Sequence, residues 1–536
     1  MPSPAQRTLI GVGLAVLFAA CVWPAIGAYF TADDFVCLTR SRAPDPVSAL
    51  RYFARDWGGS REGGVFYRPL GAVSLSIDGW LFGLRPAAFR VSGLLLHLAV
   101  TFLVGFVGRR RWRLSPPAAL LAAALFLLHP LHDQAVLWIA ARTDLLCALF
   151  MLLAFQAATG ERGAWVGVAF FAAALATKES AITLPALVLA HGLLVGRPGA
   201  GPYEAWRRAG TLAAVVPFYL LLRHVILGGV VIHGDAAFLR GGTALVKSAA
   251  KLLLWIFVPL ESNTLEGALR GVPGGLPVAG ALVLAGVLAL ALLTLRQHRR
   301  HAACLLWVVL ALGPVLARPH SWYTYLPSAG FCWLLAGWLH PDEAPTRPRL
   351  GLALAVIALF ALGLSVNTRR FRAAADLSET VVSTLAPRTG TVLLVNQPAV
   401  LHGRYPVLTA PGHYAEAMAL VGSRARVVLL THAYLRTGRE HPQAQWRPDA
   451  LNVAMETGEE SFFVLDELVK AMPGRLEPGR GIEGLGVSYR VDRLDARGRI
   501  AALTVWGFEP FVDPGAVIAE YGGGRLAVRP ASTRPD

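Results

Sequence analysis

Two adjacent carboxylates, Asp33 and Asp34, follow the first long apolar run of the chain. A charged group is costly to hold near lipid, so an acidic pair at a membrane surface is a candidate functional site. A carboxylate in such a place can take the proton from an attacking hydroxyl group. The pair could equally begin an ordinary solvated loop, and this stretch by itself favours neither interpretation.

Cations and other polar residues that could serve the same reaction occur at the ends of later apolar runs. Arg and Lys bind phosphate oxygens through charge-assisted hydrogen bonds, and apolar walls beside them suit a substrate with a phosphate and a lipid tail. Displacement of such a phosphate from a phosphate diester needs no acid, because the lipid phosphate leaves as an anion. The candidates are Asp33, Asp34, Arg68, His129, His132, Asp133, Arg142, Asp144, Lys178, Glu179, Arg318, His320 and Tyr323.

A metal site is one reading of the histidine motif. His129 and His132 are three residues apart and Asp133 follows directly, a spacing that metal sites also use. No third, distant ligand is evident in the sequence. We therefore favour a helix end capped by His129 and predict no metal.

The other polar candidates also have ordinary interpretations. Lys178 and Glu179 fit a local ion pair between helix ends as well as they fit phosphate binding. Arg318 and His320 fit a simple loop, and Tyr323 fits an aromatic anchor at the membrane interface. The sequence leaves these alternatives open.

The composition indicates a multi-pass membrane protein. The chain has 536 residues, 55% of them hydrophobic and 16% charged, with a mean hydropathy of +0.51. Several runs approach the roughly 20 residues that span a bilayer. The net charge of +16 is what Arg-rich cytoplasmic loops produce, so no nucleic-acid partner is implied. Heavy use of Ala, Gly, Pro and Arg suggests a GC-rich bacterial genome, and so a plasma (inner) membrane.

Apolar runs and cationic loops predict about eleven spans with a cytoplasmic N-terminus. Residues 71–83 are expected to form an interfacial helix, and residues 247–260 a re-entrant or interfacial segment. The cationic stretches at 109–113, 197–208, 296–301 and 347–349 then share the cytoplasmic face, and the candidate residues share the other. The spans are expected at 8–28, 87–108, 115–129, a segment ending near 158, 164–177, 181–196, 209–227, 277–296, 302–317, 325–340 and 349–366.

Long apolar runs stop near residue 372, where the composition changes. Short alternating segments after that point predict an extracytoplasmic α/β domain at 372–536. It follows a transmembrane domain at 1–371, whose first extracytoplasmic loop, 29–86, carries the acidic pair. Helices are expected at 373–386 and 414–421, and strands at 391–395, 426–430, 461–466, 487–492, 500–506 and 526–529.

Five motifs resemble the GT-C superfamily of membrane glycosyltransferases, and most nearly its TMTC-type family, which is related to the protein O-mannosyltransferases. The order and spacing of the motifs match that family across roughly residues 8–366. The motifs are ADDF (32–35), FYRPLGAVSLSIDGWLFGLRPAAFRVSGLLLH (66–97), HPLHDQAVLWIAARTDLLCALFMLLAF (129–155), LATKESAITLPALVL (175–189) and YLPSAGFCWLLA (325–336).

The resemblance implies transfer of a sugar, with inversion, from a polyprenyl-phosphate donor to a glycan, lipid or protein acceptor on the extracytoplasmic face. No cofactor besides the lipid-linked donor is expected. The resemblance places the catalytic base in the acidic pair, where we prefer Asp34 to Asp33. It also implies that the donor phosphate is bound by Arg142, Lys178, Arg318 and Arg68.

Two features depart from the family pattern. The acidic residue expected after the second His of the third motif is displaced, because the chain reads Asp133-Gln134 there. A strand-containing segment stands where the family has tetratricopeptide helices, so the identity of the acceptor cannot be taken from the family. A transporter for a lipid-linked sugar and a non-catalytic scaffold are the alternative functions. Against a transporter, no internal repeat is visible and the charges gather on one face.

Overall fold

The chain forms two compact units in the computed structural model, and each is described here by itself. The membrane unit comprises Met1–Gly27 and Arg40–Arg369, and the C-terminal unit comprises Ala28–Thr39 and Arg370–Asp536. The sequence had assigned 28–39 to the transmembrane domain, whereas these residues group with the C-terminal unit. The structure describes residues 4–57, 66–160, 163–196, 199, 201–228, 242–258, 286, 299–316, 319–340, 346–402, 404–434, 442–447, 450–455, 477–479, 481–484, 487–494, 500–508, 515–522 and 525–531.

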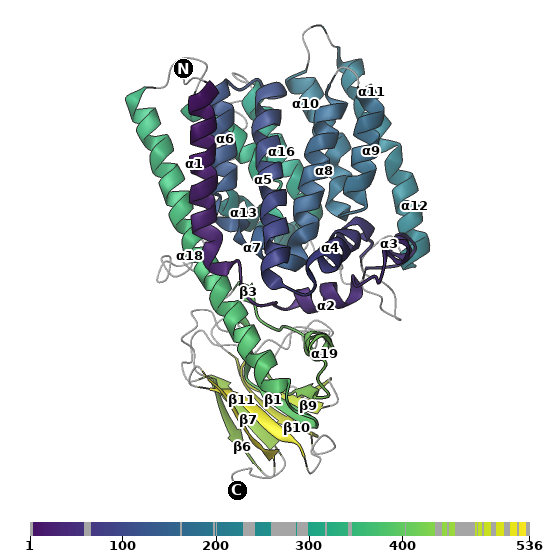
Figure 1. Cartoon of the computed structure of the whole chain (residues 1–536), viewed down its shortest axis with the longest axis vertical. Coiled ribbons are helices and arrows are strands. Elements are labelled where there is room, and N and C mark those ends of the chain that lie inside the picture. Colours follow the sequence, from purple (N-terminus) through teal and green to yellow (C-terminus); the bar gives the residue numbers. More distant parts are fainter. Residues whose placement is uncertain are drawn as a thin grey trace. The chain divides into compact units, whose positions relative to one another are not determined.

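The membrane unit is a bundle of helices (Figure 1). Several of them begin at proline, whose fixed φ and missing N–H suit the first helical turn. Ser115 stands directly before Pro116 and Pro117, a sequence pattern that predicts a helix N-cap, and it accepts a hydrogen bond from the Ala118 amide, which confirms that prediction. The helices are α1 (Pro4–Val22), α3 (Pro46–Ala49), α4 (Pro69–Phe82), α5 (Pro86–Arg110), α6 (Pro116–Leu127), α7 (Asp133–Leu137), α8 (Arg142–Ala158), α9 (Ala164–Leu175), α10 (Leu184–Leu194), α11 (Pro202–Ala213), α12 (Val215–Leu227), α13 (Gly242–Phe257), α16 (Arg299–Leu312) and α17 (Ser328–Leu339).

Among the described residues, five helices are long and apolar enough to cross a membrane, or six if the bent pair α6–α7 is one span. They are Thr8–Ala25, Pro86–Arg110, Ile139–Ala158, Pro202–Leu227 and Arg347–Leu385. The segments expected at 164–177, 181–196 and 325–340 form shorter apolar helices of 10–17 residues. Most of the expected span 277–296 lies outside the described residues. A multi-pass membrane protein is therefore supported, and the count of eleven stays a prediction.

Two expected helix limits differ from the structure. The stretch 197–208 is not a loop throughout, because α11 begins at Pro202 and carries a Glu204–Arg208 ion pair one turn apart. The expected gap between the span 349–366 and the helix 373–386 is absent, because α18 runs without interruption from Arg347 to Leu385. Hydropathy falls along α18, but the backbone hydrogen bonds that hold a helix do not require an apolar sequence. The domain boundary predicted at 371–372 nevertheless lies close to the division of the two units at Arg369–Arg370.

Aromatic rings pack together inside the membrane unit, beside the end of α5. The indoles of Trp112, Trp307 and Trp333 are fully buried, and their ring centroids lie 5.0–6.3 Å apart. Trp333 donates its indole N–H to the Val104 carbonyl at 2.8 Å, and Trp307 donates to the Leu326 carbonyl at 3.2 Å. Both polar atoms are thus satisfied inside an apolar core.

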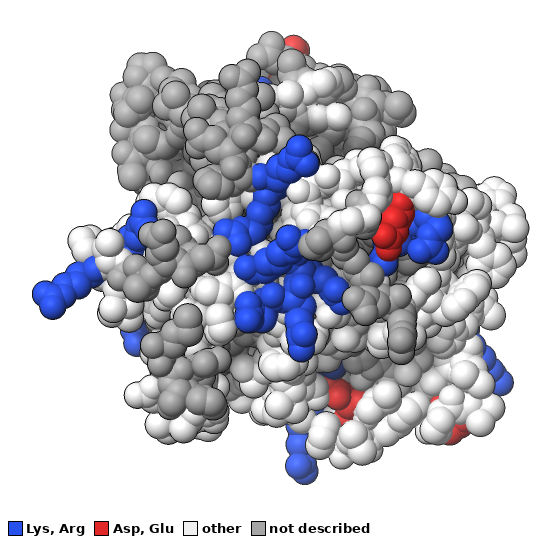
Figure 2. Space-filling model, turned by 90° about the horizontal axis from the view of Figure 1, so that it is seen from above, with Lys and Arg blue, Asp and Glu red and all other residues white. Residues whose placement is uncertain are grey.

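One end of the membrane unit is strongly cationic (Figure 2). Arg113, just after α5, donates to the carbonyl of Gly196 at 2.6 Å, and Arg300 of α16 donates to the carbonyl of Arg113 at 3.3 Å. These bonds bring the ends of α5, α10 and α16 together. Two of the cationic stretches recognised in the sequence, 109–113 and 296–301, therefore meet at this face in their described residues.

The C-terminal unit combines three sheets with helix α19 (Pro411–Leu420), the end of α18 and most of α2 (Asp33–Arg40) (Figure 1). In the sheet β12-β11-β1-β4, β1 is parallel to β11 and β4, and β12 is antiparallel to β11. The other sheets are β6-β7-β10-β9-β8, which is antiparallel, and β3-β2-β5. The strands are β1 (Thr391–Val395), β2 (Gln397–Leu401), β3 (Tyr405–Pro406), β4 (Arg426–Leu429), β5 (His432–Tyr434), β6 (Pro442–Trp446), β7 (Ala450–Met455), β8 (Gly481–Gly484), β9 (Val487–Leu494), β10 (Ile500–Trp506), β11 (Val517–Gly522) and β12 (Arg525–Pro530).

Five of the six predicted strands overlap β1, β4, β9, β10 and β12, and the sixth, 461–466, lies outside the described residues. The helix expected at 414–421 begins earlier, at Pro411. Strands β2, β3 and β5–β8 and β11 were not predicted. Most of these are short, and several contain Pro or Gly, so their sequences carry little β-strand signal.

Candidate functional site

The three predicted phosphate-binding cations that the structure describes lie at the ends of α4, α8 and α9. The amide of Leu70 donates to the Ala176 carbonyl at 3.1 Å, which fixes the start of α4 against the end of α9. Helix α4 also approaches α8 closely, because a Cβ added at Gly71 would lie 2.6 Å from Cγ2 of Thr143. Local packing therefore holds Arg68, just before α4, beside the connection between α9 and α10.

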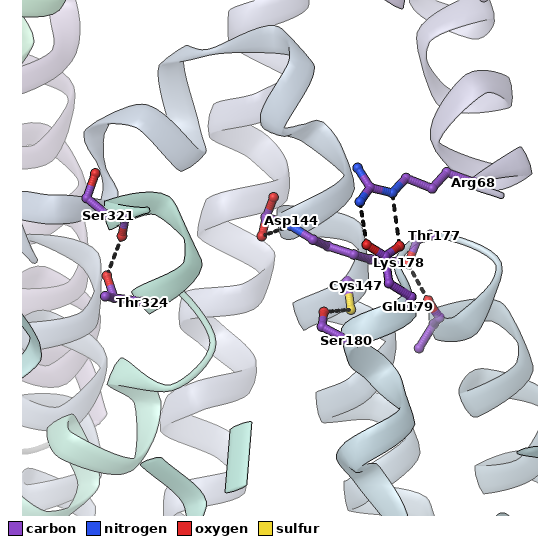
Figure 3. A network of polar contacts seen from close by, with 10 residues as sticks. Arg68, Asp144, Cys147, Thr177, Lys178, Glu179, Ser180, Ser321 and Thr324 are labelled. Atoms are coloured by element: carbon purple, nitrogen blue, oxygen red, sulfur yellow. Dashed lines mark hydrogen bonds and ion pairs between the residues drawn. The ribbon is translucent and has the colours of Figure 1, made fainter. Parts of the chain in front are cut away.

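Two ion pairs, Arg68–Glu179 and Lys178–Asp144, form a charged cluster (Figure 3). Arg68 donates to both carboxylate oxygens of Glu179, from Nε at 3.2 Å and from Nη2 at 2.7 Å. Lys178 donates to Oδ1 of Asp144 at 2.6 Å. The proposed local pair between Lys178 and Glu179 is thus replaced by two longer-range pairs, and each cation has a carboxylate counterion.

Aromatic faces cover the same cations. The Lys178 ammonium lies 4.4 Å from the ring centroid of Tyr323, and the Arg68 guanidinium lies 4.1 Å from that of Phe66. Such contacts favour a cation where water is scarce. Lys178 is thus held by one carboxylate and one ring, and Arg68 by one carboxylate and two rings, since its guanidinium also lies 5.5 Å from the ring centroid of Trp57.

The surroundings of the charged cluster shift the pKa values of Glu179 and Tyr323. Burial by itself would raise the pKa of Glu179, but the Arg68 guanidinium outweighs it and lowers that pKa to about 2. Burial raises the pKa of Tyr323, against the opposing effect of Lys178. Glu179 is therefore ionised, and Tyr323 keeps its phenolic proton, throughout the physiological pH range.

A small cavity adjoins Lys178. Its walls include Asp144, Cys147, Ser180, Tyr323 and Pro327, and its volume is about 20 Å³. That volume holds about one water molecule. The cavity is too small for a sugar, so a lipid-linked donor at this cluster would require the surrounding side chains to move.

Arg142 occupies a different environment. Its guanidinium pairs with Asp78 at 2.8 Å and donates to the Phe89 carbonyl at 2.6 Å and to Ser74 Oγ at 3.2 Å. The side chain is only 2% exposed. These contacts join α8 to α4 and α5, which is a structural role. Arg318 lies outside the described residues.

The histidine motif packs inside the bundle. His132 Nε2 lies 2.8 Å from Ser328 Oγ, and His97 Nδ1 lies 2.7 Å from the Tyr325 hydroxyl. His129 accepts a hydrogen bond from the Leu131 amide at 3.3 Å, so it caps the start of the short 3₁₀ helix Pro130–His132 and not, as the sequence predicts, the end of the preceding span. The partners His97, Tyr325 and Ser328 were missed as site residues, although they belong to the second and fifth sequence motifs.

The remaining predicted residues near this motif divide between the interior and the surface. Asp133 is buried, and its neighbour Gln134 accepts a hydrogen bond from Ser321 Oγ at 2.7 Å. His320 is exposed and stacks on Trp322 with a centroid distance of 4.3 Å. Within the described residues, no group of three or more His, Cys, Asp or Glu side chains could hold a metal ion.

The acidic pair begins helix α2 in the C-terminal unit. The Asp34 side chain is buried, and its Oδ2 accepts a hydrogen bond from the Thr31 amide at 3.0 Å. The Asp34 amide donates a hydrogen bond to the Thr31 carbonyl at 2.9 Å. The side chain and the backbone amide of Asp34 thus both bond to the Thr31 backbone and hold the turn before the helix in place. Between them, Ala32 has φ +44°, a strained conformation for a non-glycine residue.

Asp33 differs from its neighbour in exposure and partner. Its side chain is 52% exposed, and its Oδ1 lies 2.8 Å from Nε2 of His413 in α19. Nothing in the sequence indicates this contact, because His413 is distant along the chain and has no motif around it. The structure thus separates the pair into a buried capping residue and a solvent-accessible carboxylate.

Comparison with known proteins agrees with the motifs. Protein O-mannosyl-transferase TMTC4 of Homo sapiens is 37% identical over 155 residues, which is 24% of this chain and 21% of that protein. Protein O-mannosyl-transferase TMTC3 of Mus musculus is 27% identical over 193 residues, 33% of this chain and 21% of that protein. The chain resembles the TMTC-type transferases. The predicted resemblance is confirmed, over about a fifth of the length of these curated relatives.

Comparisons with protein-family models and with solved structures are less informative than these sequence matches. No protein-family model matches the chain. The oligosaccharyltransferase of Archaeoglobus fulgidus aligns with a TM-score of 0.43 and 12% identity, covering 79% of this chain and 64% of that one. The arabinofuranosyltransferase AftD from Mycobacteria aligns with a TM-score of 0.34 and 14% identity, covering 79% and 32%.

Proposed function

We propose that the protein is an inverting glycosyltransferase that moves a sugar from a polyprenyl-phosphate donor to an acceptor hydroxyl. The observation that carries the proposal is the similarity to protein O-mannosyl-transferases, together with an accessible carboxylate in the ADDF motif. The reaction would take place at the extracytoplasmic face of a bacterial plasma membrane. In this topology the N-terminus is cytoplasmic and the C-terminal unit is extracytoplasmic.

Asp33 is the better candidate for the catalytic base. A general base must reach the proton that it removes. Asp34 is buried and uses one oxygen to hold the start of α2, whereas half of the Asp33 side chain is accessible. We therefore propose Asp33 in place of Asp34, which the sequence had favoured.

Arg68 and Lys178 are the proposed ligands of the donor phosphate. Both cations are already neutralised, by Glu179 and Asp144 respectively. A phosphate would have to displace at least one carboxylate, and the cluster would then exchange one anion for another. After such an exchange each cation would still have an anionic hydrogen-bond partner, because carboxylates and phosphates both accept charge-assisted hydrogen bonds. Without substrate, the carboxylates keep the cations ordered.

A transfer assay tests the base. Membranes containing each variant would be given a radiolabelled polyprenyl-phosphate sugar and a panel of glycan, lipid and peptide acceptors. Asp33→Asn should lose about 10²- to 10⁴-fold in transfer rate, because general-base catalysis contributes that much. Asp34→Asn keeps a carbonyl oxygen that can accept the Thr31 amide, so it should keep most of the activity.

The pair of variants is its own control. Both replace a carboxylate by an amide of the same shape at adjacent positions, and thermal unfolding of each variant would show whether a loss of activity reflects a loss of folding. Full activity of folded Asp33→Asn would exclude Asp33 as the base. Loss of activity in Asp34→Asn alone would return the assignment to Asp34.

A further inference from the structure

The contact between Asp33 and His413 lies within the C-terminal unit. His413 Nε2 is 2.8 Å from Asp33 Oδ1, and the His413 side chain is 8% exposed. The other ring nitrogen, Nδ1, lies 3.0 Å from the Thr409 amide nitrogen. The imidazole therefore bridges a backbone amide and the proposed base.

The Thr409 amide determines which ring nitrogen carries the proton. A backbone N–H can only donate, so Nδ1 must accept and is unprotonated. In the neutral ring the proton is then on Nε2, which donates to Asp33 Oδ1. A neutral donor orients the Asp33 carboxylate without cancelling its charge. The second carboxylate oxygen, Oδ2, takes no part in this hydrogen bond.

The backbone supports the same arrangement. The amide of Ala32, directly before Asp33, donates to the Val407 carbonyl at 2.7 Å. Val407 is two residues before Thr409, which in turn holds the imidazole. Both ends of the Asp33–His413 bond are thus attached to one hydrogen-bonded stretch of backbone, and this stretch fixes the distance between them.

We propose that His413 is a positioning residue that holds the Asp33 carboxylate in one orientation for proton abstraction. This inference rests on the proposed function. It assigns to the strand-containing C-terminal unit a direct part in the transfer reaction, through the start of α19. Fixing a reacting group in the right geometry removes an entropic part of the barrier, and a displacement of about 1 Å can cost roughly 10²-fold in rate.

Two amide substitutions separate positioning from folding. In His413→Gln, the side-chain NH₂ can take the place of Nε2 and still donate to Asp33. In His413→Asn, the side-chain oxygen can take the place of Nδ1 and accept the Thr409 amide, but the shorter side chain does not reach Asp33. The exposed neighbour Ala415 provides a control, Ala415→Gln, on the same helix.

The rate of sugar transfer and the thermal unfolding of the full-length protein would be measured for each variant. We expect His413→Asn to lower kcat by about 10- to 10²-fold with little change in donor KM, and His413→Gln to recover most of that loss. In an Asp33→Asn background, His413→Asn should add little further loss, because the two residues act as one unit.

The failures can be told apart. If Asp33→Asn is fully active, the proposed base is wrong. If Asp33→Asn is inactive while His413→Asn is as active as the wild type, only the positioning role is overturned. Equal losses in the Asn and Gln variants, accompanied by equal drops in melting temperature, would also overturn it, since they would show a purely structural histidine.

Discussion

The close approach of α4 to α8 offers a quantitative test of how the charged cluster is positioned. A methyl group at Gly71 would lie 2.6 Å from Thr143 Cγ2, whereas carbon atoms in contact are separated by about 3.5–4.0 Å. Gly71→Ala must therefore move the helices apart by about 1 Å. Overpacking of this kind costs about 1–3 kcal/mol, and the better helix propensity of Ala returns about 1 kcal/mol.

The same helix contains a matched control. A Cβ at Gly79 would have no neighbour within 4 Å, so Gly79→Ala should only gain helix propensity, about 1 kcal/mol. Gly71→Ala should therefore be about 1–3 kcal/mol less stable than Gly79→Ala. Thermal unfolding of the detergent-solubilised protein would measure the difference, and the transfer rate should fall only in Gly71→Ala.

A second substitution, at Thr143, should rescue Gly71→Ala. Thr143→Ser removes the methyl that the new Cβ meets, and alone it should cost about 1 kcal/mol, the effect of a methyl-sized void. Combined with Gly71→Ala, it should restore stability, so the two changes should show coupling of about 1–3 kcal/mol. Additive effects, or equal stability of Gly71→Ala and Gly79→Ala, would refute the predicted clash.

Three further predictions concern the charged cluster. Arg68→Lys replaces a two-point contact with Glu179 by a single one, so we expect a loss of about 1 kcal/mol in thermal unfolding, and no loss would contradict the bidentate geometry. Lys178→Met should raise the donor KM at least tenfold in the transfer assay, and adding Asp144→Leu should recover stability without activity, since the apolar pair is folded but binds no phosphate. Because the pKa of Glu179 is lowered to about 2 from 4.5, its ion pair stabilises the fold above pH 4.5, and this contribution decreases as the pH falls toward 2. The stability difference between the wild type and Glu179→Gln should therefore shrink over that interval, and a constant difference would argue against the ion pair.

Local signals in the sequence predicted part of this architecture. Ser115 and the proline after it predicted the start of α6, and both occur there in the structure. The gap expected between residues 366 and 373 is absent because it was inferred from hydropathy, whereas a helix continues as long as its backbone bonds are made. Helix α11 extended into a cationic stretch because Glu204 compensates Arg208.

The sequence identified the charged residues better than it identified their partners. Arg68 and Glu179 are separated by 111 positions, and their pairing depends on how α4 packs at the end of α9. Lys178 has a carboxylate directly beside it in sequence, yet it pairs with Asp144. His413 had no motif of its own. Side-chain pairing across a fold depends on tertiary packing, which residue types and spacing alone do not encode.

The buried indoles provide an optical reporter of the membrane unit. Trp112, Trp307 and Trp333 lie within 6.3 Å of one another, close enough for their electronic transitions to couple. Such a group in a rigid core gives a strong near-ultraviolet circular dichroism signal, which disappears when side-chain packing is lost even if the helices persist. Spectra of each variant, recorded in detergent, can therefore separate a damaged membrane unit from a chemical defect before any sugar is added.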